Sequence, residues 1–134
     1  MIFTDTSAWY AYEVPDDMNH SKAREFAERI RRGEFGSIIT SDYVLDESLT
    51  LLRMRRGLHV SSAFIKKVLS SESVTIIWVD GAIFNKALEM FLKSEKEAWT
   101  FTDCTSFTIM RQLKIADAFA FDENFKEAGF TTYP

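Results

Sequence analysis

Apolar and polar positions follow two different patterns along this chain, and each pattern predicts a different kind of element. Short apolar runs predict buried strands, of which the clearest is 74–79, rich in β-branched residues. Longer stretches place apolar residues every three or four positions, which predicts amphipathic helices. One such stretch, 18–32, is followed by Gly33 as a stop signal. Its apolar stripe comprises Ala23, Phe26, Ala27 and Ile30.

The predicted strands alternate with the predicted helices. We expect strands at 2–5, 37–40, 74–79, 116–121 and 130–133, the last at an edge of the sheet. We expect helices at 18–32, at 43–56 with Asp42 as N-cap and Gly57 as stop, at 60–69, after the cap Asp80 through Lys93, and at 103–113. Parallel pairing follows, because parallel strands need crossover connections. The pattern predicts an α/β fold, a three-layer α/β/α sandwich around a central parallel sheet, formed by residues 1–134 as one domain.

Acidic residues stand where several of these segments end. Asp5 closes the first apolar run and Asp122 closes the run 118–121, while Glu47 and Asp103 belong to predicted helices. A carboxylate after a strand tends to project from the carboxyl end of that strand, where ligands bind in open α/β sheets. Carboxylates gathered there repel one another unless a cation neutralises them. Oxygen ligands suit Mg²⁺ or Mn²⁺.

The same residues carry a family resemblance. The segments concerned are Ile2–Ala8, Asp46–Glu47, Thr102–Cys104 and Phe121–Phe125. In their order they resemble the acidic signature of PIN domains, and among these the VapC-type toxin ribonucleases, over nearly the whole chain. Many relatives have Thr or Ser two residues before the last acid, where this chain has Ala120.

The resemblance implies both an activity and partners. It implies a metal-dependent endoribonuclease that acts on RNA, in which four acids hold Mg²⁺ or Mn²⁺: Asp5, Glu47, Asp103 and Asp122. Ser7 matches a small hydroxyl residue beside the first acid and would support it. The resemblance also implies a three-layer PIN fold, a homodimer and an inhibitory antitoxin protein.

Each acid also has an ordinary structural interpretation. Asp5 would cap the turn 6–12, with Ser7 orienting it or capping in its place. Asp103 would be a helix N-cap or a first-turn acid, favoured by the helix dipole, and Asp122 a turn former. Glu47 would be a solvated glutamate on a helix, and Asp46 competes with it for one role. The helical wheel favours Glu47, because it borders the apolar stripe of Val44, Leu45, Leu49, Leu51 and Leu52 while Asp46 points farther out.

Net charge and cysteine content limit which functions and locations the protein can have. The net charge of −4, from 16 basic and 20 acidic residues, is not that of a simple nucleic-acid binder. It does not exclude an enzyme that cuts RNA, because a bound cation reverses the local effect of the carboxylates. The single cysteine allows no intramolecular disulfide, and there is neither a signal-peptide pattern nor an apolar stretch of ~18 residues. We therefore expect a cytoplasmic protein without a membrane segment.

Three other classes remain to be compared with the nuclease. Cys104 adjoins Asp103 and invites a thiol mechanism, but neither His20 nor His59 stands in a partner motif, which favours a buried structural thiol. A phosphohydrolase of the haloacid-dehalogenase kind requires a second Asp where this chain has Ser7. A non-catalytic PIN-like module that binds RNA or protein is the stronger rival. Such a module typically loses one or more of the acids, and this chain keeps them all.

Overall fold

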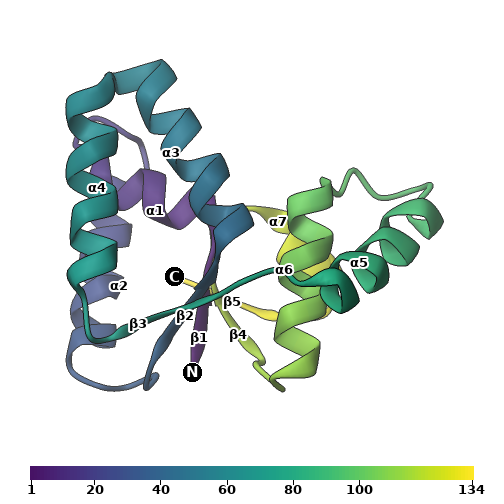
Figure 1. Ribbon diagram of the computed structural model, residues 1–134. Helices are drawn as coiled ribbons and strands as arrows, with labels where there is room; N and C mark the ends of the chain where they lie inside the picture. Colours follow the sequence, from purple (N-terminus) through teal and green to yellow (C-terminus); the bar gives the residue numbers. More distant parts are fainter.

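The protein is built around a sheet of five strands with helices packed on both faces (Figure 1). A computed structural model describes residues 1–134. In chain order the elements are β1 (Ile2–Thr4), α1 (Thr6–Glu13), α2 (His20–Arg31), β2 (Ile38–Ser41), α3 (Asp42–Arg56), α4 (Leu58–Ser70), β3 (Val74–Ile77), α5 (Gly81–Lys93), α6 (Phe101–Gln112), β4 (Asp117–Phe119), α7 (Glu123–Glu127) and β5 (Thr131–Tyr133). None of the helices combines the length and the apolar character needed to cross a bilayer.

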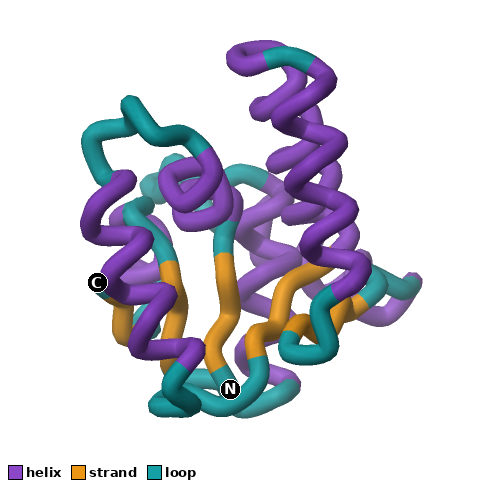
Figure 2. Tube along the Cα trace, turned by 90° about the vertical axis from the view of Figure 1, so that its left-hand side faces the viewer, coloured by secondary structure: helices purple, strands orange, loops and turns teal.

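The strands lie in the order β3-β2-β1-β4-β5, and every neighbouring pair is parallel. Strand β1 is central, with Ile2 opposite Ile38 of β2 on one side and Asp117 of β4 on the other. Figure 2 shows the strands side by side between the helices, with the N-terminus at the lower end of β1. All strands run the same way, so their carboxyl ends share one edge of the sheet. The predicted α/β fold with a central parallel sheet is confirmed.

Neighbouring residues of β1 face opposite layers, as the pleat of a strand requires. Ile2 packs in an apolar cluster with α1 and α2, which includes Phe26. Phe3 packs in a second cluster with α6 and α7, which includes Phe107 and Phe125. Helices α3 and α4 pair with each other through a third cluster, which includes Leu52 and lies on the α1 side (Figure 1). The three-layer prediction is therefore confirmed.

One predicted cap and one predicted helix start are wrong by one and two residues. Ser41, not Asp42, is the N-cap of α3, because its Oγ accepts the N–H of Val44 at 3.1 Å. Asp42 lies in the first turn, and its carboxylate instead accepts the N–H of Val79 at 2.8 Å. Helix α6 begins at Phe101 rather than Asp103, because the hydroxyl of Thr100 caps it. In both cases a hydroxyl residue just upstream satisfies the free N–H groups.

The sequence pattern did not predict helices at α1 and α7. These helices have 8 and 5 residues, so an apolar stripe has too few turns in which to repeat. The helix stops were predicted correctly. Gly33 and Gly57 follow α2 and α3 with φ of 85° and 91°, a left-handed backbone that glycine adopts without steric cost.

Candidate active site

The sheet has one topological switch point, between β1 and β4. The chain leaves β1 toward β2 and β3 on one side, and the order on the other side is β4 then β5. Ligands of open parallel sheets bind in the crevice outside the carboxyl ends of such neighbouring strands. Asp5 directly follows β1, and Asp122 lies three residues after the end of β4. These two predicted site residues therefore follow the carboxyl ends of the two strands at the switch point.

Asp5 caps α1, as its ordinary structural interpretation predicts, and it also lies at the carboxyl end of β1. Its Oδ2 accepts the N–H of Ser7 at 3.1 Å and the hydroxyl of Ser7 at 2.7 Å. The side chain is only 4% exposed. Burial raises the pKa of Asp5 to about 7, against the two hydrogen bonds from Ser7, and the charges of Asp103 and Glu47 raise it further. A carboxyl group with this pKa is poised between its two protonation states at neutral pH.

Ser7 also connects the ends of the two central strands. Its Oγ donates to Asp5 and accepts the backbone N–H of Phe121 at 3.0 Å. Phe121 belongs to the segment that follows β4 and precedes Asp122. Ala120 contributes no hydroxyl there, and its own backbone N–H donates to the carbonyl of Tyr133. Ser7 is thus the hydroxyl that holds this segment against Asp5.

Glu47 lies on the face of α3 that borders the core, while its neighbour Asp46 is exposed. Burial raises the pKa of Glu47, a hydrogen bond with the Thr6 side chain lowers it, and the charges of Asp103 and Asp122 raise it. The helical wheel thus ranked the two acids correctly by exposure. The wheel did not single out Ser48, which is buried one residue later and donates its hydroxyl to Thr6 Oγ1 at 3.3 Å.

Asp103 forms a capping box with Thr100 at the start of α6. Its backbone N–H donates to Thr100 Oγ1 and its Oδ2 accepts the N–H of Thr100, both at 3.0 Å. The residue is 5% exposed. Burial raises its pKa, against hydrogen bonds from Thr100 and from Asn124, and the charge of Asp122 raises it. The prediction of a first-turn acid is therefore correct, and the charge of Asp122 acts on the same carboxylate.

Asp122 is the N-cap of α7, and a residue that the sequence pattern did not single out connects it to Asp103. Asp122 Oδ1 accepts the backbone N–H of Asn124 at 2.9 Å. The side-chain Nδ2 of Asn124 donates to Asp103 Oδ2 at 2.9 Å and lies 3.4 Å from Asp122 Oδ2. No local signal could reveal this contact, because 21 residues separate Asn124 from Asp103.

The four acids share one electrostatic environment. Asp5 is influenced by Glu47 and Asp103, and Glu47 is influenced by Asp103 and Asp122. All their oxygens are hard ligands, and neighbouring negative charges of this kind favour a divalent cation. No group of three His, Cys, Asp or Glu side chains is arranged so that it could hold a metal ion as it stands. The residues therefore fit an oxygen-ligated cation in ligand type and charge, without forming a complete coordination shell.

The cysteine, the two histidines and Asp117 do not belong to this group of acids. Cys104 is fully buried, and burial raises the pKa of its thiol to about 11, so it is not a ready nucleophile. The prediction of a buried structural thiol is confirmed. His20 Nδ1 lies 2.8 Å from the carbonyl of Ala11, and His59 is exposed on α4. Asp117 begins β4, at the edge of the sheet opposite the crevice.

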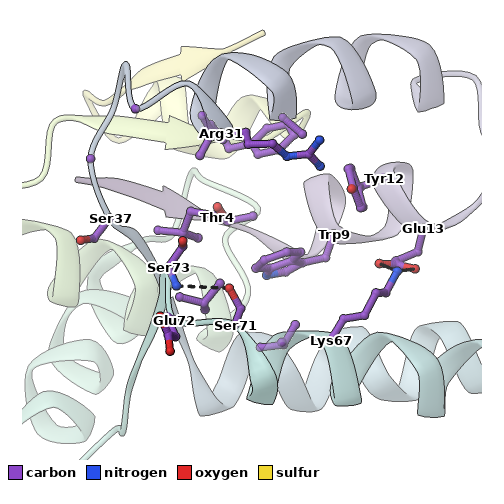
Figure 3. A pocket seen from close by; sticks show the side chains of 18 residues that line it. Thr4, Trp9, Tyr12, Glu13, Arg31, Ser37, Lys67, Ser71, Glu72 and Ser73 are labelled. Atoms are coloured by element: carbon purple, nitrogen blue, oxygen red, sulfur yellow. Dashed lines mark hydrogen bonds and ion pairs between the residues drawn. The ribbon is translucent and has the colours of Figure 1, made fainter.

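A cavity of about 650 Å³ lies elsewhere, between α1, α2, α4 and the strands β2 and β3 (Figure 3). None of the four acids lines it. Figure 3 shows Trp9 extending into it and the ion pair of Lys67 with Glu13 at one side. Its lining also includes Thr4, whose buried hydroxyl has no hydrogen-bond partner. The volume lies in the range of ligand pockets, and the cavity is separate from the four acids.

The sequence matches one protein family and is similar to known proteins whose names include VapC. The family model described as PIN domain matches residues 2–131. A curated protein of Mycobacterium tuberculosis named 23S rRNA-specific endonuclease VapC20 is 34% identical over 130 residues, which cover 97% of this chain and 95% of that protein. A protein of Archaeoglobus fulgidus named VapC ribonuclease is 25% identical over 112 residues, which cover 83% of this chain and 70% of the relative.

Solved structures agree in fold. The crystal structure of the M. tuberculosis protein VapC20, described as a sarcin-ricin loop cleaving toxin, superposes with a TM-score of 0.88 at 33% identity. The match covers 98% of this chain and 97% of that one. The structure of FitAcB from Neisseria gonorrhoeae, with a TM-score of 0.67, is 12% identical and shows the fold alone.

Proposed function

Because this chain belongs to the PIN domain family, we propose that it is a metal-dependent endoribonuclease and the toxin of a toxin–antitoxin pair. The observation that supports the proposal is that the charges of Asp5, Glu47, Asp103 and Asp122 act on one another. The names of the two VapC relatives support RNA as the substrate. An RNA substrate also supports the cytoplasm as the location.

The proposed cofactor is Mg²⁺ or Mn²⁺, held by these four carboxylates. The cation supplies Lewis acidity, which lowers the pKa of water and stabilises negative charge on a phosphate. The protein supplies the position of the ligands: Ser7 holds Asp5, and Thr100 holds Asp103. Glu47 is less buried than Asp5 and Asp103, and burial raises its pKa in the cation-free protein, so a bound cation would restore its ionised form.

The proposal includes two protein partners. For the antitoxin, the cavity lined by Trp9 on α1 and by side chains of α2 and α4 has apolar and charged residues that an amphipathic segment would match. For a homodimer, α5 exposes three large apolar side chains, Phe84, Phe91 and Leu92. Exposed apolar residues of this kind mark interaction surfaces when they lie together on one element. Both assignments are testable by substitution of the residues named.

The direct experiment is cleavage of ribosomal RNA and of a synthetic stem–loop by the purified chain. Cleavage should occur with Mn²⁺ or Mg²⁺, stop with excess chelator, and return when the cation is added back. The double variant Asp5→Asn with Asp122→Asn should remain folded and inactive. Equal cleavage in chelator would defeat the metal-dependent mechanism.

The alternative of a non-catalytic module makes a different prediction in the same experiment. Such a module would bind the RNA and leave it intact under every cation condition. Binding without cleavage by a folded wild-type chain would therefore favour that alternative. The retention of all four acids argues against it, because a binding module has no need for clustered negative charge near a phosphate.

A further inference from the structure

Asn124 is the one neutral side chain that contacts two of the four acids. Its Nδ2 donates to Asp103 Oδ2 at 2.9 Å and lies 3.4 Å from Asp122 Oδ2. Its backbone N–H donates to the other oxygen of Asp122 at 2.9 Å. The two carboxylates come from different elements, the first turn of α6 and the turn before α7. One amide group therefore joins two parts of the site that are distant in the sequence.

The backbone at Asn124 is held in place by the residue that follows it. Phe125 is fully buried, and its ring lies 5.0 Å from the ring of Phe107 on α6 and 6.3 Å from the ring of Phe3 on β1. Helix α7 is thus anchored to α6, which carries Asp103 in its first turn, and to β1, which ends just before Asp5. Because Phe125 adjoins Asn124, the backbone of Asn124 cannot shift far without disturbing the core.

The chemistry of an amide suits this position. Two carboxylates that face one another repel, and a primary amide has two N–H hydrogens, one available to each of them. Asparagine satisfies both acceptors without adding charge. An aspartate of the same shape would add a further negative charge and no donor. Side chains that orient metal ligands in this way typically change metal affinity by about 10- to 100-fold when they are removed.

We propose that Asn124 is a positioning residue, which holds the carboxylates of Asp103 and Asp122 at a fixed separation through its side-chain amide so that they can receive a divalent cation together. The cation part of this inference rests on the proposed function. The contact itself does not, because it is made by the protein alone. Asn124 acts through the two acids and is not assigned a contact with RNA.

The first test is Mn²⁺ binding by the RNA-free protein, measured by titration calorimetry. Asn124→Ala should weaken Mn²⁺ binding by about tenfold or more. Asn85→Ala is the matched control, because Asn85 is exposed on α5 and should leave the affinity unchanged. Wild-type affinity in a folded Asn124→Ala protein would overturn the proposal.

The second test needs no metal and separates this proposal from the proposed function. In chelator, Asn124→Ala should lower the Tm when it is introduced into the wild type. The same substitution should lower the Tm less in a protein that already carries Asp103→Ala, because the hydrogen bond between residues 124 and 103 is then already absent. Equal Tm losses in both backgrounds would mean that no such bond exists.

Asn124→Asp supplies a second variant. It should melt below the wild type in chelator and gain more from added Mn²⁺, because it brings an extra carboxylate to the site.

Failure of the positioning role and failure of the proposed function would give different results. A wild-type protein that binds no Mn²⁺ would contradict the metal-dependent function, while the Tm coupling between Asn124 and Asp103 would still report on the amide contact. A wild type that binds Mn²⁺ and cuts RNA, with an Asn124→Ala variant that does both equally well, would contradict the positioning role alone.

Discussion

The hydroxyl of Ser7 accepts the backbone N–H of Phe121 at 3.0 Å, across 114 positions of the sequence. The same hydroxyl donates to Asp5 at 2.7 Å. One oxygen thereby joins the segment after β1 to the segment after β4, the two strands that border the proposed active site. The position of Asp5 is therefore coupled to that of the chain leading to Asp122.

Ser7→Ala should weaken both the fold and the activity. The substitution leaves the Phe121 N–H without its partner and removes one bond to Asp5, which together cost about 1–3 kcal/mol of unfolding free energy. RNA cleavage should fall because Asp5 loses its orientation. Urea unfolding and cleavage rate measure the two effects. Ser70→Ala, at an exposed serine that bonds only within its own helix, is the control. Identical behaviour of the two variants would show that the Ser7 contact contributes nothing.

Asp103→Asn should separate metal binding from helix capping. If Asp103 holds a cation, cleavage should fall by orders of magnitude while the unfolding free energy changes by less than about 1 kcal/mol, because an asparagine still accepts the N–H of Thr100. Asp80→Asn is the matched control, since Asp80 caps α5 through Ile83 and is not one of the clustered acids. Near-wild-type cleavage by folded Asp103→Asn protein would leave the ligand assignment without support.

The cation-free protein should lose stability as the pH rises from about 4 to about 7. The folded-state pKa of Asp5, about 7, lies above its ordinary value of 3.8, so the folded protein retains a proton that the unfolded chain releases. Its contribution is fully present below 3.8 and is lost as the pH passes 7. About 1.4 kcal/mol per pKa unit sets an upper limit of roughly 4 kcal/mol. The raised pKa values of Glu47 and Asp103 act in the same direction.

Unfolding in urea with chelator, at several pH values, measures this slope. Asp5→Asn should flatten it, because the amide does not ionise. Saturating Mn²⁺ should reverse the loss in the wild type, since the cation binds the ionised carboxylates of the folded state. An unchanged slope in Asp5→Asn would mean that another group holds the proton.

Cys104 should behave as a buried structural thiol. Its thiol is inaccessible and its pKa of about 11 leaves little thiolate at neutral pH, so a disulfide reagent should react slowly with native protein and rapidly in denaturant. Cys104→Ala should retain RNA cleavage and lose about 1–2 kcal/mol of stability from the lost packing. Loss of cleavage in a stably folded Cys104→Ala protein would restore the thiol mechanism as a candidate.

The sequence by itself determined the class of fold. Short apolar strands alternate with amphipathic helices, and this periodicity is local, so it predicts the layers and the parallel sheet without knowledge of distant contacts. Gly33 and Gly57 ended their helices as expected, because the left-handed backbone at a helix end is a local requirement. The family resemblance was also visible in the sequence, because it rests on short motifs and on the order in which the acids occur.

Only the tertiary structure decided how the acids are held. The contacts of Asn124 with Asp103 and of Ser7 with Phe121 join residues 21 and 114 positions apart. No periodicity or cap signal encodes such a distance, because it depends on how β1, β4 and α6 pack around Phe107 and Phe125. Burial likewise shifts the pKa of Asp5, and burial is a property of the assembled layers rather than of any segment.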